Sequence, residues 1–347
     1  MAVSRLSSLA AAAPAPVYAA IGEGAAAAIE DLFLDARLDR AASPRHAALL
    51  LVCGRFRDDD IADLCRLHDQ LPHPRATLRW RAEALPGFTP DGVDLAPDAD
   101  VAAALHAVYR ALVAGARASE PALLPDEPPN PWRGRGDHGQ GGEGMMGGVP
   151  YGRPMAMTDD DLRDGLALDA YAAPFGPFLS AFPPGLRLDL TLQGDVIQKL
   201  AVARPPFDQP LEAAHPLRLA ARMLLPLGLP GLAERMLRRA AGLAPGTPAA
   251  VADLARALRW RGARAALPPG LGRIPGGGDV RTRLDGLLAA AGRGEAAPAP
   301  GAPMALSELL VGREWAEAML VLASLEPGWL RRACRADMPH APSEDAA

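Results

Sequence analysis

Residues 43–75 read SPRHAALLLVCGRFRDDDIADLCRLHDQLPHPR, and this stretch determines the predicted fold. Residues 47–53 are all apolar, and Gly54 ends the run. A strand in a parallel sheet is covered on both faces, so its sequence is a continuous apolar run rather than an alternation of apolar and polar residues. The run therefore predicts a buried strand in a parallel sheet.

The residues after Gly54 predict the rest of one βαβ unit. Apolar residues over 61–67 recur at the spacing of a helix face. Pro72 and Pro74 end this helix and extend the chain toward a second strand at residues 77–80. A strand, a helix and a second strand in this order form the unit from which α/β folds are built.

Two more helices complete the predicted N-terminal domain, residues 21–118. One covers residues 25–34, where apolar side chains share a face. The other runs to about residue 116 and begins at Asp98 or Asp100, either of which can cap it. We expect an α/β domain of the flavodoxin-like type, with a short parallel sheet.

A second domain is predicted over residues 166–340. Residues 186–202 form two runs with apolar and polar residues in alternation, joined at Gln193 and Gly194, which predicts a β-hairpin with one wet face. Apolar periodicity then predicts helices throughout residues 211–335. We expect an α+β domain with a helical bundle. Its predicted helices cover residues 217–227, 232–241, 251–260, 280–291 and 306–325.

The two ends of the chain are predicted to be tails. Residues 1–20 contain an Ala-rich stretch interrupted by Pro14 and Pro16, and we interpret them as a disordered tail. A signal peptide is the alternative reading of the same residues. Residues 341–347 form the second tail.

Residues 119–165 are rich in Pro and Gly and predict a linker segment between the domains. Nine glycines fall between residues 134 and 152, and they match the Gly-x-Gly-x-x-Gly pattern twice. A dinucleotide site also needs a strand before the glycines and a helix after them, and neither pattern is present. The apolar side chains of the segment instead predict a partner-binding surface. They are Met145, Met146, Tyr151, Met155 and Met157.

Composition excludes several classes of protein. The chain has 347 residues and a net charge of −5, which gives no basic patch for nucleic acid. Its three cysteines form neither a disulfide framework nor a Cys-x-x-Cys metal site. No apolar run approaches the roughly 18–20 residues of a membrane helix.

Two parts of the chain resemble subunits of one enzyme family. Ser43-Pro44-Arg45, the apolar strand ending in Gly54, and residues 69–74 resemble the complex I subunit that holds the terminal iron–sulfur cluster. The same motifs resemble the small subunits of energy-converting NiFe hydrogenases, with Leu71 in place of a Met. Residues 176–185 and the hairpin resemble the quinone-site subunit of complex I, which is related to the hydrogenase large subunit.

The resemblance implies cofactor ligands that this chain lacks. The cluster cysteines would fall at about Ala26-Ala27, near residues 81–84 and near residues 96–98, and no cysteine stands there. A NiFe centre needs two Cys-x-x-Cys pairs, but Cys334 is the one cysteine of the second domain. The quinone-site histidine is also missing from residues 176–185. We expect no cofactor and no metal.

The resemblance with its lost ligands implies a non-catalytic structural or assembly subunit of a complex I-like (NADH-quinone oxidoreductase) or hydrogenase-like membrane complex. Its expected partners are membrane-arm or other subunits, and its expected location is cytoplasmic, on the inner face of the cytoplasmic membrane. One alternative is an oxidoreductase subunit with a remodelled quinone or small-molecule pocket around His138 and Tyr151. Another is a stand-alone interaction module.

Two weaker patterns favour ordinary roles. His138 beside Asp137 and Glu143 matches an acid–base group, but nothing in a Gly-rich segment fixes its geometry. The acidic residues 159–161 match a cation site, and a solvated turn explains them as well.

Overall fold

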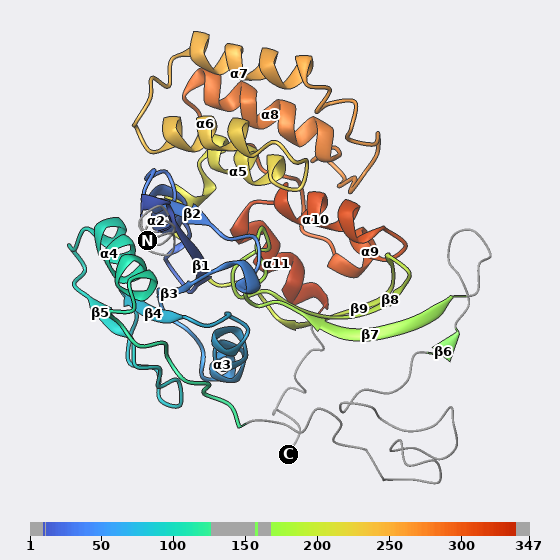
Figure 1. Ribbon diagram of the computed structural model, residues 1–347. Coiled ribbons are helices and arrows are strands. Elements are labelled where there is room, and N and C mark those ends of the chain that lie inside the picture. Colours follow the sequence, from blue (N-terminus) through green and yellow to red (C-terminus); the bar gives the residue numbers. More distant parts are fainter. Residues whose placement is uncertain (1–9, 11, 126–156, 159–167, 338–347) are drawn as a thin grey trace, which may run out of the picture.

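The computed structural model describes residues 10, 12–125, 157–158 and 168–337. The first half is an α/β domain with a five-stranded parallel sheet in the order β2-β1-β3-β4-β5 (Figure 1). This is the flavodoxin-like order, and the predicted fold class is confirmed. The elements are β1 (Ala15–Ile21), α2 (Ala26–Leu32), β2 (Leu38–Arg40), β3 (Leu49–Cys53), α3 (Ile61–Asp69), β4 (Ala76–Trp80), β5 (Val93–Leu95) and α4 (Val101–Val113).

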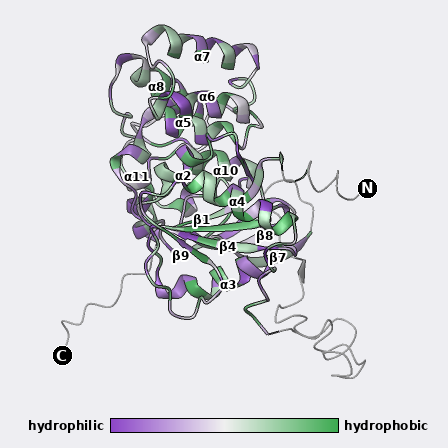
Figure 2. Ribbon diagram, turned by 60° about the vertical axis from the view of Figure 1, so that its left-hand side comes forward, coloured by the Kyte–Doolittle hydropathy of each residue, from purple (hydrophilic) through white to green (hydrophobic). Residues whose placement is uncertain are grey.

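The predicted βαβ unit is β3-α3-β4. All five residues of β3 are buried, because the sheet is covered on both faces. Helices α2 and α4 pack on one face, where Leu49 and Leu51 point, and α3 packs on the other, against Leu50 and Val52. Figure 2 shows the resulting apolar strands between more polar helix surfaces. Asp100, one of the two predicted caps, accepts a hydrogen bond from the Ala103 amide and begins α4.

The prediction of a disordered tail over residues 1–20 is wrong for residues 15–20. They belong to β1, which lies between β2 and β3. Val17 and Ala20 are fully buried there. Proline is tolerated at the start of a strand, and Pro16 is the second residue of β1.

The predicted linker begins with residues that are part of the α/β domain. Glu120 is buried and accepts hydrogen bonds from the Thr77 amide at 2.8 Å and from its hydroxyl at 2.7 Å. The His68 ring lies between Glu120 and Asp69, at 3.1 and 2.7 Å. The Leu123 and Leu124 amides donate to Asp69 in turn. Residues 119–124 are therefore bound to the sheet and to α3.

The second half contains a four-stranded antiparallel sheet in the order β6-β7-β8-β9, with helices on one side of it (Figure 1). The predicted hairpin is confirmed as β8 and β9, whereas β7 carries no clear alternation and was not predicted. The strands are β6 (Met157–Thr158), β7 (Asp169–Phe175), β8 (Arg187–Gln193) and β9 (Val196–Arg204).

The second half contains seven α-helices among the described residues, and four of the five predicted helices form at their places. The seven helices are α5 (Pro216–Leu224), α6 (Pro230–Ala240), α7 (Pro248–Trp260), α8 (Val280–Arg293), α9 (Leu306–Leu310), α10 (Trp315–Ala323) and α11 (Pro327–Asp337). The single helix predicted over residues 306–325 is wrong, because the chain breaks between α9 and α10. Gly312 has a φ of +77° and donates to the Ile197 carbonyl at 2.8 Å, so this turn bonds to β9. Within the described part of the chain, no helix is long and apolar enough to span a bilayer.

Candidate functional site between the two domains

Most residues of the predicted partner-binding surface lie outside the described residues. These are Met145, Met146, Tyr151 and Met155, and the alternative pocket around His138 lies outside them as well. Met157 is in β6, where its backbone pairs with Ala170 of β7. Among the described residues, the candidate site lies in a different place, where the two domains meet.

The positions at which the resemblance implies cluster cysteines all follow strands of the parallel sheet. Ala26 and Ala27 begin α2, just after β1. Arg81 directly follows β4, and Pro97 follows β5. Parallel strands end at a common edge, so these residues lie along one edge of the sheet.

Of these positions, Ala26 and Ala27 are buried, whereas residues 96–98 and all but one of residues 81–84 are exposed. Trp80 donates from its indole Nε1 to the Pro97 carbonyl at 3.3 Å, and the Arg81 guanidinium lies 4.4 Å from the centre of the Trp80 ring. Ala26 and Ala27 pack against Ala213 of the second domain. A tetranuclear cluster needs four converging thiolates, and these residues supply none. They do not fit the cluster that the resemblance implies.

Backbone fills the space directly between β1 and β3. Ligands of open α/β sheets bind outside the carboxyl ends of the strands, at the point where the strand order reverses. In this sheet the order reverses between β1 and β3. The Gly22 amide donates to the Cys53 carbonyl at 2.7 Å. A Cβ on Gly54 would lie 2.7 Å from the Glu23 carbonyl oxygen, and the φ of Gly54 is +93°.

An ion cluster joins α3 to the second sheet, and we call Asp60, Asp63, Arg187 and Arg204 the α3 ion cluster. Asp60 is fully buried and receives Arg204 Nη1 at 2.5 Å. Asp63 pairs with Arg187 at 3.0 Å and also with Arg204. Burial raises the pKa of Asp60, and the neighbouring arginine opposes that shift. Asp63 also pairs with Arg66 of its own helix at 2.8 Å, so the two carboxylates meet guanidiniums from both domains.

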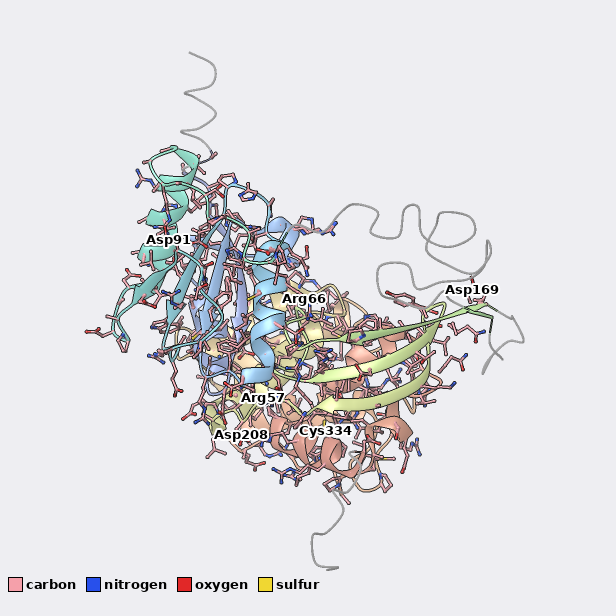
Figure 3. The ribbon with its side chains drawn as sticks, turned by 90° about the horizontal axis from the view of Figure 1, so that it is seen from below. Arg57, Arg66, Asp91, Asp169, Asp208 and Cys334 are labelled. Carbon is pink, nitrogen blue, oxygen red and sulfur yellow. The ribbon has the colours of Figure 1, made fainter. Side chains whose placement is uncertain are left out.

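Arg57 strengthens the same junction from the start of α3 (Figure 3). Its guanidinium donates to the Gly185 and Pro205 carbonyls at 3.1 and 2.6 Å. It also lies 4.4 Å from the centre of the Phe207 ring. Two carbonyls and an aromatic face of one domain therefore hold a cation of the other.

A second set of charges joins α2 to α5. Glu30 is buried and accepts from Arg222 Nε at 2.6 Å and from Arg218 Nη1 at 3.2 Å. Arg218 also donates to Asp31 at 2.9 Å. The Nη2 atom of Arg222 is buried and has no hydrogen-bond partner among the described residues.

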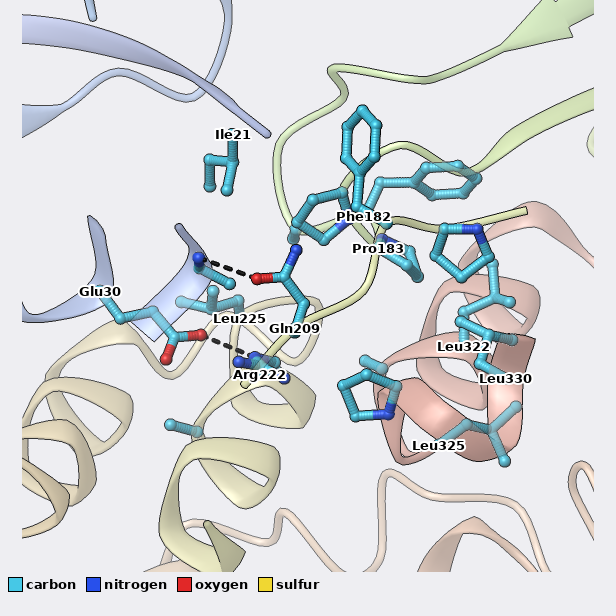
Figure 4. A pocket seen from close by; sticks show the side chains of 18 of the residues that line it. Ile21, Glu30, Phe182, Pro183, Gln209, Arg222, Leu225, Leu322, Leu325 and Leu330 are labelled. Atoms are coloured by element: carbon cyan, nitrogen blue, oxygen red, sulfur yellow. Dashed lines mark hydrogen bonds and ion pairs between the residues drawn. The ribbon is translucent and has the colours of Figure 1, made fainter. Parts of the chain in front are cut away.

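A cavity lies beside this second set, between the domains (Figure 4). It encloses about 860 Å³ of space free of protein atoms, part of which opens to solvent. Its walls come from β1 and α2 on one side and from the loops around β8 and β9 and helices α5, α10 and α11 on the other. Most wall residues are apolar, and they include Ile21, Phe182, Phe207, Leu225, Leu322 and Leu330.

Arg40, at the end of β2, also lines the cavity. Its guanidinium lies 5.5 Å from the centre of the Phe33 ring, and the described residues give it neither a hydrogen bond nor an ion pair. Burial lowers the pKa of Arg40, and the nearby charge of Glu30 opposes that shift. Arg40 is half-buried, and a cation partly removed from water without an ion pair favours an anionic group at this end of the cavity.

Sequence reasoning identified none of the charged residues of this site. Glu30 and Arg222 are 192 positions apart, and Asp60 and Arg204 are 144 apart, so no local motif connects them. One weak signal was present, because Glu30 lies on the otherwise apolar face of the helix predicted at residues 25–34.

Comparison with known proteins leaves the site to be interpreted on its own geometry. No protein-family model, no curated protein and no solved structure matches this chain. The described residues contain no group of three or more His, Cys, Asp or Glu side chains placed to hold a metal ion.

Proposed function

We propose that the chain is a non-catalytic structural or assembly subunit of a complex I-like or hydrogenase-like membrane complex. One observation carries the proposal. The segments that the resemblance equates with cluster-bearing loops follow strands at one edge of the parallel sheet, and no cysteine stands in them; Ala26 and Ala27, at the first position, pack against Ala213. The chain thus combines the predicted scaffold with positions that supply no thiolate ligand.

The domain junction supports the same proposal. The α3 ion cluster, Arg57 and the Glu30 pairs connect the two domains through buried, charge-assisted contacts. In the family that the chain resembles, the counterparts of the two domains are two separate subunits. Because both domains belong to one chain here, they would present a single preassembled surface to other subunits.

Native purification tests this proposal. A tagged copy of the full chain, extracted from membranes in mild detergent, should co-purify with antiporter-like or other membrane-arm subunits at a fixed ratio. The matched control is Asp60→Ala, which disrupts the domain junction and should lower the recovery of those subunits. Recovery of the intact chain without any membrane subunit would refute the proposal.

Metal analysis separately tests whether the chain lacks an iron–sulfur cluster. Protein purified anaerobically should be colourless and contain neither iron nor acid-labile sulfide in stoichiometric amount. Stoichiometric sulfide would show that the chain holds a cluster through some other set of ligands, and the non-catalytic assignment would then fail.

The cavity between the domains favours a second candidate function, which is small-molecule binding. Apolar walls with a few convergent polar groups are typical of ligand sites, and such sites often lie between domains. In the resemblance, the corresponding subunits enclose a quinone, but the expected pocket around His138 is in a different part of the chain.

A further inference from the structure

The cavity between the domains has a charged side and an apolar side. Figure 4 shows Glu30 and Arg222 on one side, and Leu322, Leu325 and Leu330 on the opposite side. A ligand that satisfies both sides needs an apolar body and a polar head.

The charged side has one positive charge in excess. Three guanidiniums, those of Arg40, Arg218 and Arg222, face two carboxylates, Glu30 and Asp31. The Asp31 side chain is 41% exposed, so solvent screens its charge more than it screens the buried Glu30. A head group with a single negative charge would balance the set.

Two guanidiniums also have unused hydrogen-bonding capacity. Arg222 uses Nε for Glu30, which leaves its buried Nη2 without a partner among the described residues. Arg40 donates to none of the described residues, although it lines the same cavity. Oxyanions are the acceptors that guanidinium donors bind most strongly.

We propose that the cavity binds an amphipathic monoanion, with the oxyanion head at Arg40 and Arg222 and the apolar body against α10 and α11. The proposal does not depend on the assembly role, because it concerns the isolated chain. A neutral apolar ligand of the same size would leave the excess charge and both sets of free donors unsatisfied.

Calorimetry on the full-length protein tests the proposal with three probes. Sodium decanoate has both body and head, 1-decanol has the body alone, and sodium acetate has the head alone. Decanoate should bind with one-to-one stoichiometry, about tenfold or more tightly than decanol, since losing a charge-assisted contact costs at least this factor. Acetate should show no binding at the same concentrations.

Variants locate the site. Arg40→Met should remove the preference for decanoate while decanol binding persists, which also shows that the cavity is intact. Arg45→Met is the matched control, because Arg45 is exposed on the following turn and does not line the cavity. Leu237→Trp, which adds bulk to the wall, should weaken both ligands.

Four outcomes would overturn the proposal. Equal affinity for decanoate and decanol would show that the cavity selects neutral apolar molecules. An unchanged preference in Arg40→Met, or unchanged binding in Leu237→Trp, would place the decanoate site elsewhere. Absence of decanoate binding to the wild-type chain would exclude the ligand class, and this result does not require any variant to fold.

Discussion

The α3 ion cluster and the cavity beside α2 both lie where the two domains meet, but their charges are arranged differently. In the α3 ion cluster, Asp60 and Asp63 are matched by two guanidiniums, and each carboxylate has a partner at 3.0 Å or less. At the cavity, Arg40 has neither a hydrogen bond nor an ion pair among the described residues, and Arg222 keeps a buried nitrogen unbonded. In the α3 ion cluster both interdomain arginines are paired with carboxylates, whereas at the cavity one arginine lacks an ion pair.

The difference separates a structural role from a binding role. A buried ion pair is destabilised by several kcal/mol when one partner is removed, because the other charge stays buried and alone. Arg40 has no ion-pair partner among the described residues, so its removal costs no pairing energy. Substitution should therefore lower the free energy of unfolding at residues that hold the domains together and raise it at Arg40, which lines the proposed ligand site.

The largest effect is expected for Asp60→Ala in the α3 ion cluster. It removes one of the two carboxylates that pair with Arg204 and also the acceptor for the Arg57 amide, so the free energy of unfolding should fall by about 3–5 kcal/mol. Urea unfolding measures the change. Asp59→Ala is the control, since Asp59 is the exposed neighbour and should stay within about 0.5 kcal/mol of wild type. A loss for Asp60→Ala as small as that of the control would contradict the assigned role.

A neutral backbone contact lies between the two regions, and Gly54→Val tests it. The new Cβ would meet the Glu23 carbonyl at 2.7 Å and the Ala25 Cβ at 2.9 Å, at a φ that β-branched residues avoid. We expect a loss of about 1–3 kcal/mol in thermal unfolding. Gly115→Ala, with a φ of +70° but open space, isolates the conformational part and should cost less. Equal losses would mean that the close approach contributes nothing.

Glu120 is a third buried carboxylate, and it shows that hydrogen-bond partners decide in which direction the pKa of a buried carboxylate shifts. Burial raises its pKa, but hydrogen bonds from His68 and Thr77 outweigh burial, and the pKa lies below its ordinary value. Its contribution is therefore present above the pKa of the unfolded chain and is lost as pH falls through the folded pKa. Asp60, whose pKa is raised, has the opposite dependence, with stability lost as pH rises through the folded value.

Unfolding free energies between pH 3 and pH 7 measure this contrast. Glu120→Gln should lower stability at pH 7 by about 1–2 kcal/mol and should flatten the loss seen on acidification. Glu83→Gln is the control, because Glu83 is exposed beyond the end of β4. An acid profile in Glu120→Gln identical to that of wild type would assign the pH dependence to other carboxylates.

The smallest effect, and the one with the opposite sign, is expected for Arg40→Met. Removing a half-buried cation that has no ion pair among the described residues, while keeping its volume, should raise the free energy of unfolding by up to about 1 kcal/mol. Arg204→Met provides the comparison, since the same change in the α3 ion cluster should lower stability. If Arg40→Met destabilised the protein as much as Arg204→Met, Arg40 would have a structural partner, and the distinction between the two regions would be lost.

Strands β3 and β1 show how far sequence reasoning reaches. Both are central strands of one sheet, but β3 is a run of large apolar residues, whereas β1 mixes alanines with Pro16 and Tyr18. Alanine favours helices and packs little surface, so the pattern of β1 is indistinguishable from that of an Ala-rich tail. Its burial follows from pairing with β2 and β3, which a linear pattern does not contain.

The break between α9 and α10 has a similar cause. Apolar periodicity continues through residues 306–325, and local preference predicts one helix there. The amide of Ile197 in β9 donates to the Arg313 carbonyl at 2.9 Å, and Gly312 donates back to Ile197. This long-range pairing satisfies the backbone of the turn, and it outweighs the local tendency to continue the helix.

The sequence by itself determined the βαβ unit, the hairpin and most helix positions, because those follow from the period of apolar residues along a few turns of chain. The tertiary structure alone decided the place of β1, the α3 ion cluster and the cavity with Arg40 and Arg222. The place of β1 depends on its pairing with β2 and β3. The ion cluster and the cavity depend on residues more than a hundred positions apart, and the charge balance of a site is fixed only when folding brings its members together. The sequence states which side chain stands at each position, but the role of that side chain depends on its partners and its burial, and both are set by the tertiary structure.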